Sequence, residues 1–144
     1  MGVRTPADLH AAVRFARHFE PDVLLEETVP GEDLRVILVG GELAAAIRRA
    51  PAAVTGDGVH TLRQLILRRN ASRRREDPSN LIPWDAETRR NLGELGRRPE
   101  EIPACGEQVR VRLTNNYHTG GTVDVVTADV PARALRIAQR IVRR

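Results

Sequence analysis

Apolar and polar residues follow two different periods along the chain, which predicts helices mixed with short strands. The first period is helical, because Leu9, Val13, Ala16 and Phe19 recur every three or four residues and share one face. Thr5 precedes this run as a suitable N-cap, with a proline at the first helical position and an acidic residue at the third. A helix is therefore expected to begin just after Thr5.

The next apolar runs have the length and composition of strands. Residues 23–29 (VLLEETV) and 34–39 (LRVILV) are rich in β-branched and aliphatic residues, and 42–50 (ELAAAIRRA) follows the pair Gly40-Gly41. Two glycines between strand-like runs are a signal for a tight hairpin turn. The pattern predicts that 34–39 and 42–50 pair as antiparallel strands.

The rest of the chain continues this mixture. A GDG turn at 56–58 precedes a helix over 60–70, in which Leu62, Leu65 and Ile66 face inward. The later elements are expected in this order: a mobile loop over 68–84, a short helix capped by Asp85 and ending near Leu95, strands over 109–114 and 122–127, and a final helix from Pro131. The predicted fold class is α+β, with a central antiparallel sheet and flanking helices.

Composition limits the setting of the molecule. A chain of 144 residues fits one modest domain, and 41% hydrophobic residues with only 3% aromatics predict a mainly aliphatic core. Cys105 is the only cysteine, which excludes an intramolecular disulfide. No apolar stretch approaches the roughly 18 residues of a membrane span. We expect a cytoplasmic protein with no membrane contact.

The net charge of +4 raises the question of a nucleic-acid partner. All 23 basic residues are arginines, which indicates a bias of genome composition before it indicates a phosphate-binding surface. Few aromatic residues are present to stack on bases, and the basic run 68–77 is typical of a solvated loop. Nucleic-acid binding therefore remains a minor alternative, and no nucleic-acid partner is expected. The spacing of His10, His18 and His60 also predicts no metal ligand set.

Three longer segments point to a family. Residues 23–49 (VLLEETVPGEDLRVILVGGELAAAIRR), 48–66 (RRAPAAVTGDGVHTLRQLI) and 100–126 (EEIPACGEQVRVRLTNNYHTGGTVDVV) resemble ATP-grasp ligases in sequence and spacing. The resemblance is to cyanophycin synthetases, N-acetylglutaminylglutamine synthetases and the ATP-grasp part of bifunctional glutathione synthetases. It covers nearly the whole chain, and the combination of segments is more specific than any single motif.

The resemblance implies an ATP-dependent carboxylate-amine ligase. Such an enzyme phosphorylates a carboxylate to an acylphosphate, which an amine then displaces to form an amide or peptide bond. ATP, Mg²⁺ and small amino-acid or peptide substrates are the implied ligands. Phosphoryl transfer depends on positioning and charge neutralisation, so cationic side chains near the transferred group are expected.

The resemblance also assigns residues to ATP and its substrates. Glu26, Glu27 and Val29 match the hinge that meets adenine, and Asp33 matches the acid that accepts hydrogen bonds from the ribose hydroxyls. Without the family, these acids would merely keep a hairpin end solvated. The positions that match phosphate or acyl-substrate contacts are Arg35, Arg49, Thr119, Gly120 and Gly121, and those that match catalytic contacts to the transferred phosphoryl group are Arg112 and Asn116.

Each of these assignments has a plainer alternative. Arginines on strands often only cover a sheet with their aliphatic stems. The glycines after Thr119 let backbone amides approach an anion closely, but a Gly-Gly pair is also a common hairpin turn. Both explanations of the loop over 113–125 stay open.

The match is also incomplete. The family's phosphate-loop lysine and its magnesium-binding acids have no counterpart in this sequence. Residues 1–144 are therefore expected to be a partial ATP-grasp domain, comprising the hinge and much of the C-terminal subdomain and inactive in isolation, with the metal ligands outside this chain. A non-catalytic nucleotide-binding or interaction module is the alternative, and assembly into a homo-oligomer stays open.

Overall fold

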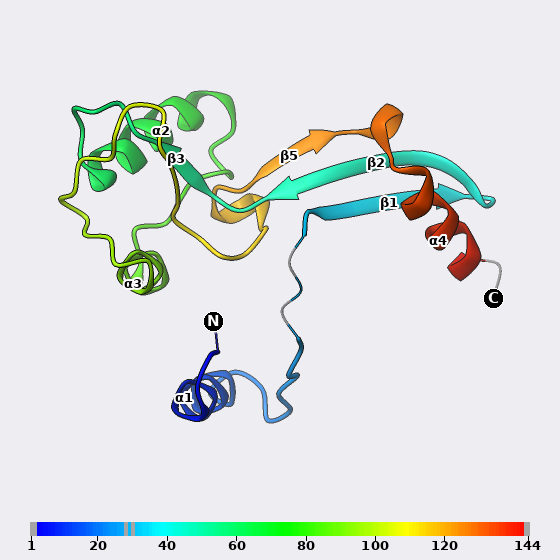
Figure 1. The fold of residues 1–144 in the computed structure, drawn as a ribbon, viewed down its shortest axis with the longest axis horizontal. Coiled ribbons are helices and arrows are strands. Elements are labelled where there is room, and N and C mark those ends of the chain that lie inside the picture. The colour runs from blue at the N-terminus through cyan, green and yellow to red at the C-terminus, as the bar shows by residue number, and fades with distance from the viewer. Residues whose placement is uncertain (1–2, 28, 30, 143–144) are drawn as a thin grey trace. The chain divides into compact units, whose positions relative to one another are not determined.

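The computed structural model describes residues 3–27, 29 and 31–142, and the chain divides into two compact units, Met1–Gly31 and Glu32–Arg144. The first unit contains helix α1, and the second contains all strands that the structure describes (Figure 1). These antiparallel strands and helices confirm the predicted α+β class.

Helix α1 (Pro6–Ala16) begins at the predicted cap. The Thr5 hydroxyl accepts a hydrogen bond from the Asp8 amide at 3.2 Å, and the Asp8 carboxylate accepts one from the Thr5 amide at 2.9 Å. This reciprocal pair satisfies two amides that a helix start leaves without partners. At the end of the helix, the ring of Phe15 meets that of Phe19, just beyond the helix, edge to face with centroids 5.4 Å apart.

The strand expected over 23–29 is not formed. Residues 23–27 and 29 have no regular secondary structure, so this prediction is wrong. A strand needs a hydrogen-bonded neighbour, and every strand pairing of the described chain lies at or beyond Asp33. Apolar composition alone does not form a strand when its edge finds no partner.

The larger sheet has three antiparallel strands in the order β1-β2-β5. Strands β1 (Asp33–Val39) and β2 (Glu42–Ala50) form the predicted hairpin, whose two turn glycines have φ of +61° and +87°. Only glycine adopts such a pair of left-handed conformations without strain, which explains the Gly-Gly sequence. A bulge next to Ile37 interrupts the β1–β2 register.

Strand β5 (Thr122–Val125) is shorter than the predicted 122–127. Beyond it, the chain turns into the short 3₁₀ helix η2 (Thr127–Asp129), whose Thr127 hydroxyl accepts a hydrogen bond from the Ala46 amide at 3.0 Å. A side chain thus takes the place of a strand carbonyl, and the ladder stops there.

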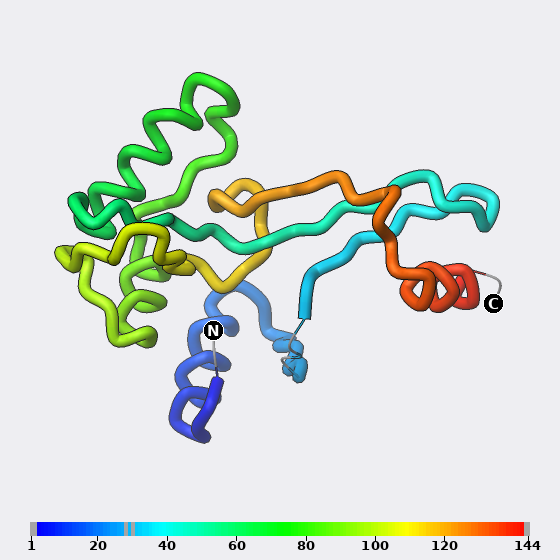
Figure 2. The backbone as a smooth tube through the Cα atoms, turned by 45° about the horizontal axis from the view of Figure 1, so that its top comes forward, coloured from blue at the N-terminus to red at the C-terminus, as the bar shows by residue number. Residues whose placement is uncertain are grey.

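Helix α4 (Ala132–Val142) follows and packs against β1 near the hairpin turn, as Figures 1 and 2 both show. The side-chain amide of Gln139 donates to the Gly41 carbonyl at 3.2 Å. On β1 the half-buried Leu34, Val36 and Leu38 alternate with exposed residues. One face of the sheet is therefore covered and the other open, since side chains alternate between faces.

A second, two-stranded sheet joins β3 (Ala53–Thr55) to β4 (Gln108–Arg110). The sequence did not predict β3, and β4 is shorter than the expected 109–114. The amides of both Val111 and Arg112 donate to the carbonyl of Ala52, at 2.8 and 3.2 Å. Two donors on one acceptor break the ladder, so the chain leaves the sheet after Arg110.

Helix α2 (Leu62–Glu76) is capped by Thr61 and Gln64, and it is longer than predicted. Residues 68–76 belong to this helix, which corrects the expected loop over 68–84. No glycine or proline interrupts the run before Pro78, and arginines in the last turn interact favourably with the helix dipole. Within the expected loop, only residues 77–84 lie outside regular secondary structure. Helix α3 (Ala86–Glu94) begins at Asp85 as expected.

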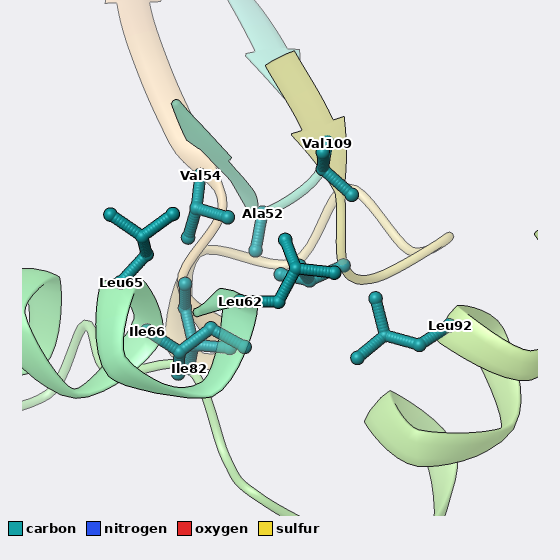
Figure 3. Packing of buried hydrophobic residues seen from close by; sticks show 9 residues of the cluster. Ala52, Val54, Leu62, Leu65, Ile66, Ile82, Leu92 and Val109 are labelled. Carbon is teal, nitrogen blue, oxygen red and sulfur yellow. The ribbon is translucent and has the colours of Figure 1, made fainter. Parts of the chain in front are cut away.

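The core lies between α2, α3 and the two-stranded sheet (Figure 3). The predicted inward residues of α2 are buried. The buried cluster is formed by Ala52, Val54, Leu62, Leu65, Ile66, Ile82, Leu92, Val109 and Val111, with Trp84 packed against it. This core holds the segment after Arg110 in place. That segment leads into the loop that contains Gly120 and Gly121, the glycine loop.

Candidate functional site

A charged cluster lies where β1 begins and β2 ends. Asp33 and Arg49 are directly paired across the two strands, and the guanidinium reaches both carboxylate oxygens, at 2.7 and 3.3 Å. The side-chain amide of Asn115 donates to the same carboxylate at 3.1 Å. The hairpin thereby connects to the loop before the glycine pair, although 82 residues separate Asn115 from Asp33.

The Asp33 carboxylate is stabilised as an anion. The hydrogen bond from Arg49 holds the pKa of Asp33 below its ordinary value, with the Asn115 amide and the charge of Arg35 acting in the same direction and partial burial opposing them. The Asp33 and Arg49 side chains are 25% and 29% exposed. A polar ligand can therefore still reach this pair.

The open face of the three-stranded sheet continues from this cluster. Side chains alternate, so Arg35, Ile37 and Val39 of β1 project on the same face as Asp33. All three are exposed. Val123 and Val125 of β5 lie on this face too and are also exposed. The open face is thus apolar along its length and charged at the end that holds Asp33.

The loop after Asn115 is closed by its own hydrogen bonds. Asn116 caps the short 3₁₀ helix η1 (Tyr117–Thr119), because its side-chain oxygen accepts from the His118 amide at 2.9 Å. The amides of Thr119 and Gly121 donate to the Asn116 carbonyl, and that of Gly120 donates to Tyr117. All four amides from 118 to 121 are therefore engaged within the loop.

Close packing explains why this loop contains two glycines. Gly120 has φ of +87°, and a Cβ added there would overlap the Ile82 side chain and lie 3.1 Å from its backbone nitrogen. A Cβ on Gly121 would lie 2.7 Å from the Asn116 carbonyl oxygen and 2.9 Å from that of Ala50. Real side chains do not tolerate these distances, so both positions require glycine for packing reasons alone.

Three side chains from the α2 region hold the loop from outside. Arg69 donates to the Gly120 carbonyl at 2.8 Å, Asn80 donates to the Gly121 carbonyl at 2.9 Å, and the Tyr117 hydroxyl donates to Asp77 at 2.6 Å. The Tyr117 hydrogen bond, with those from Ser79, lowers the pKa of Asp77 to about 2. The sequence alone did not predict that Arg69, Asp77 and Asn80 contact this loop. Only the DPS turn at 77–79 signalled a carboxylate with a local structural role.

Arg112 lies in a different environment from the loop that follows it. Its residue surface is only 4% exposed. One terminal nitrogen donates to both oxygens of Asp85, at 2.7 and 2.9 Å, and to the Thr88 hydroxyl, while the other donates to Glu87 at 2.6 Å. Its Nε is buried and has no hydrogen-bond partner within the described residues. Both terminal nitrogens are therefore occupied by protein groups.

Partial burial acts on the acids of this cluster as well. Burial alone would raise the pKa of Asp85, but the Thr88 amide and the Arg112 guanidinium outweigh it, and the pKa lies below its ordinary value. Asp85 thus serves both as the cap of α3 and as the counterion of Arg112. The cluster fastens the segment after β4 to the start of α3.

Comparison with known proteins gives this arrangement a context. No family model matches the chain. The glutathione biosynthesis bifunctional protein GshAB of Listeria welshimeri is 30% identical over 140 residues, which cover 94% of this chain and 18% of that protein. Cyanophycin synthetase of Trichormus variabilis is 30% identical over 145 residues, covering 98% of this chain and 16% of that protein. The chain thus resembles one segment of each of these two proteins.

A solved structure supports the same relationship. The crystal structure of a bifunctional glutathione synthetase from Pasteurella multocida matches with a TM-score of 0.62 at 25% identity, over 81% of this chain and 16% of that one. The segment thus spans less than a fifth of the length of these relatives. The similarity confirms the predicted fold class and the predicted resemblance to these synthetases.

The structure brings together only some of the residues that the family resemblance nominates. Asp33 and Arg49 are in contact, with Arg35 on the same face, and Asn116, Thr119, Gly120 and Gly121 form one closed loop. Glu26, Glu27 and Val29 are exposed and belong to the first unit. Asn115 was not predicted, although an Asn-Asn pair before the glycines was a visible signal.

Two further properties of the described residues concern metal ligands and membrane-spanning helices. Within the described ranges, no three His, Cys, Asp or Glu side chains lie close enough together to hold a metal ion. No helix among the described residues is long and apolar enough to cross a bilayer.

Proposed function

We propose that this chain forms part of the active site of an ATP-dependent carboxylate-amine ligase, which makes an amide or peptide bond through an acylphosphate. Homology to glutathione and cyanophycin synthetases supports the reaction class. The observation that carries the proposal is the cluster of Asp33, Arg49 and Asn115 at the charged end of an otherwise apolar open face.

The open face has the chemistry that a nucleotide needs. An adenine ring packs on apolar side chains such as those of Ile37 and Val125, and a ribose needs hydrogen-bond acceptors nearby. The ionised Asp33 carboxylate supplies such an acceptor, and in this proposal it receives the ribose hydroxyls. The hinge residues Glu26, Glu27 and Val29 meet the adenine.

The arginines provide positive charge beside this acceptor. Arg35 is exposed, and no ion pair involving it is found within the described ranges, so its guanidinium is available to a phosphate or to the carboxylate of the acyl substrate. Arg49 remains bound to Asp33 and adds to the local potential. Both arginines bind oxyanions in the proposed enzyme.

The glycine loop and Arg112 complete the proposal. We place Asn116, Thr119, Gly120 and Gly121 beside the transferred phosphoryl group, with Arg112 as a catalytic contact. Because the loop amides are engaged and Arg112 is held by two carboxylates, these contacts require the loop or the Arg112 cluster to rearrange when substrate binds.

Magnesium belongs to the proposed reaction but not to these described residues. Mg²⁺ bridges and neutralises phosphate oxygens in enzymes of this class. It prefers octahedral coordination by oxygen ligands, and the described part of the chain presents no group of three candidate ligands. In this proposal its ligands lie outside the chain. An ATP-consuming ligase also works where ATP is abundant, so a cytoplasmic location is part of the same proposal.

The direct test is amide formation by the full-length protein that carries this chain. Purified protein is incubated with ATP, Mg²⁺ and pools of amino acids and short peptides, and ADP and new amide products are measured by mass spectrometry. The proposal expects ADP and amide in equal amounts from the full-length protein and neither from the 144-residue chain alone. ATP binding without any amide product would instead support a non-catalytic nucleotide-binding module.

A further inference from the structure

An arginine-lined groove lies between α2 and the two-stranded sheet. Its volume is about 780 Å³, within the range of small-molecule sites. The polar side chains that line it are Thr55, Arg68, Arg69, Gln108, Arg110 and Thr122. No acidic residue is among the lining residues, so three positive charges face one space without a negative charge between them.

Arg69 supplies the fixed charge of this groove. Its terminal nitrogens donate to the carbonyls of Ala53 and Gly120, which hold the side chain in one orientation. Partial burial, together with the charge of Arg73, lowers the pKa of Arg69. No ion pair with a carboxylate is found for it within the described ranges. A half-buried cation without a counterion makes an anionic ligand favourable.

Arg68 and Arg110 line the groove together with Arg69, and both are exposed. Neither forms an ion pair with a described carboxylate, and the nearest polar partner found for Arg68 is a ring nitrogen of His60 at 3.5 Å. Arg49 and Arg112 differ in this respect, because they are bound to acids. Two guanidinium groups without a described carboxylate partner therefore line the same groove as the anchored Arg69.

We infer that this groove binds a small multivalent anion, a molecule with clustered phosphate or carboxylate groups. Guanidinium groups bind such oxyanions through paired hydrogen bonds. The hydroxyls of Thr55 and Thr122 and the amide of Gln108 add donors to the same space. No aromatic residue is among the lining residues, which disfavours a track for single-stranded nucleic acid. The inference does not depend on the proposed ligase activity.

The experiment is isothermal titration calorimetry of the 144-residue chain at low ionic strength. Tripolyphosphate and citrate serve as separate probes, so that phosphate and carboxylate ligands are distinguished. The expected result is one binding site for at least one probe. The double variant Arg68→Gln/Arg110→Gln is expected to weaken that binding at least tenfold, because it removes two charges and their hydrogen-bond donors.

A matched control separates a built site from general electrostatic attraction. Arg133→Gln/Arg136→Gln removes the same net charge from exposed positions of α4 and is expected to change binding less than twofold. Circular dichroism and thermal melting confirm that both double variants fold. The inference is overturned if neither probe binds or if the control weakens binding as much as the groove variant. Binding of duplex DNA that displaces the probe through the same two arginines would also overturn it, in favour of a nucleic-acid surface.

Discussion

Arg112 carries a positive charge into a buried position because two carboxylates and a hydroxyl surround it. Replacing it by alanine is expected to lower the free energy of unfolding by about 2–3 kcal/mol, the size of hydrogen bonds to charged groups. The loss stays below the roughly 3–5 kcal/mol of a fully buried pair, because the Asp85 and Glu87 side chains remain 44% and 32% exposed and can be rehydrated. Urea denaturation of the chain measures this.

Arg110→Ala is the matched control for stability, since Arg110 is exposed and only two residues away. It should stay within about 0.5 kcal/mol of the wild type. Under the proposed function, Arg112→Ala in the full-length protein is also expected to reduce kcat about a hundredfold, as removal of one preorganised donor does in comparable sites. A variant that folds normally and keeps its kcat would refute the catalytic role and leave Arg112 with the structural one.

The second residue prediction concerns the pKa of Asp77, which lies at about 2. Tyr117→Phe removes the hydrogen bond from the phenol hydroxyl, so the pKa of Asp77 should rise toward its ordinary value of 3.8, while the bonds from Ser79 keep it lower. Because the folded-state pKa is depressed, this carboxylate stabilises the fold above about pH 4 and loses that effect as the pH falls toward 2.

An NMR titration of the Asp77 side-chain carboxyl in wild type and in Tyr117→Phe measures this shift. His118→Phe provides the comparison, since it removes only a smaller charge effect on Asp77 and leaves the Tyr117 hydroxyl in place, so it should raise the pKa of Asp77 less than Tyr117→Phe does. Equal pKa values for Asp77 in wild type and Tyr117→Phe would mean that the hydrogen bond does not form in solution.

Among residues, the sequence nominated Asp33 and Arg49 for the site but did not nominate Asn115, whose amide donates to Asp33. The Gly-Gly turn alone would pair Asp33 with Arg48, and the bulge between Ile37 and Leu38 shifts the register by one residue so that Asp33 faces Arg49. The contact with Asn115 joins positions 82 residues apart and depends on the path of the intervening helices. No local pattern contains that path, so a single sequence could not place Asn115.

At the scale of elements, the β1–β2 turn and the glycine loop each contain a left-handed glycine, and the two can be compared. Gly40 has φ of +61° and open space where a Cβ would lie, whereas Gly120 has φ of +87° and is crowded by Ile82. Gly40→Ala should cost about 1–2 kcal/mol of stability from backbone strain alone. Gly120→Ala should cost about 1–3 kcal/mol more, the range of overpacking in a close-packed site.

Chemical denaturation of both variants tests this difference, and Gly40→Ala serves as the matched control because the backbone strain is common to both. If the two variants lose the same stability, Gly120 is required only for its backbone conformation, and the packing argument fails. In that case the approach of a ligand to the loop would again be the better reason for the glycine pair.

Elements with strong local signals were predicted well. The cap at Thr5, the hairpin and the start of α3 at Asp85 all depend on residues adjacent in sequence. The failures have a common cause. The strand over 23–29 lacks a partner, β3 exists only because β4 pairs with it, and α2 continues through a polar run that looked like a loop. Pairing and helix length there depend on tertiary contacts, which propensity does not contain.

At the scale of the whole molecule, the chain corresponds to a small part of much longer relatives. The proposed ribose contact of Asp33 is therefore tested in the full-length protein. The test must separate recognition of the ribose from loss of folding.

Asp33→Ala in the full-length protein is expected to weaken ATP binding by about 1.5–3 kcal/mol, the range for hydrogen bonds to a charged group. The decisive quantity is the ratio of the affinities for ATP and 2′-deoxy-ATP, because a folding defect lowers both affinities equally and leaves the ratio unchanged. Wild type should prefer ATP, and Asp33→Ala should lose most of that preference. Asp124→Ala, an exposed acid on β5, should keep it. A preference for ATP that survives in Asp33→Ala would show that another group contacts the ribose 2′-hydroxyl, and the assignment of Asp33 would then be wrong.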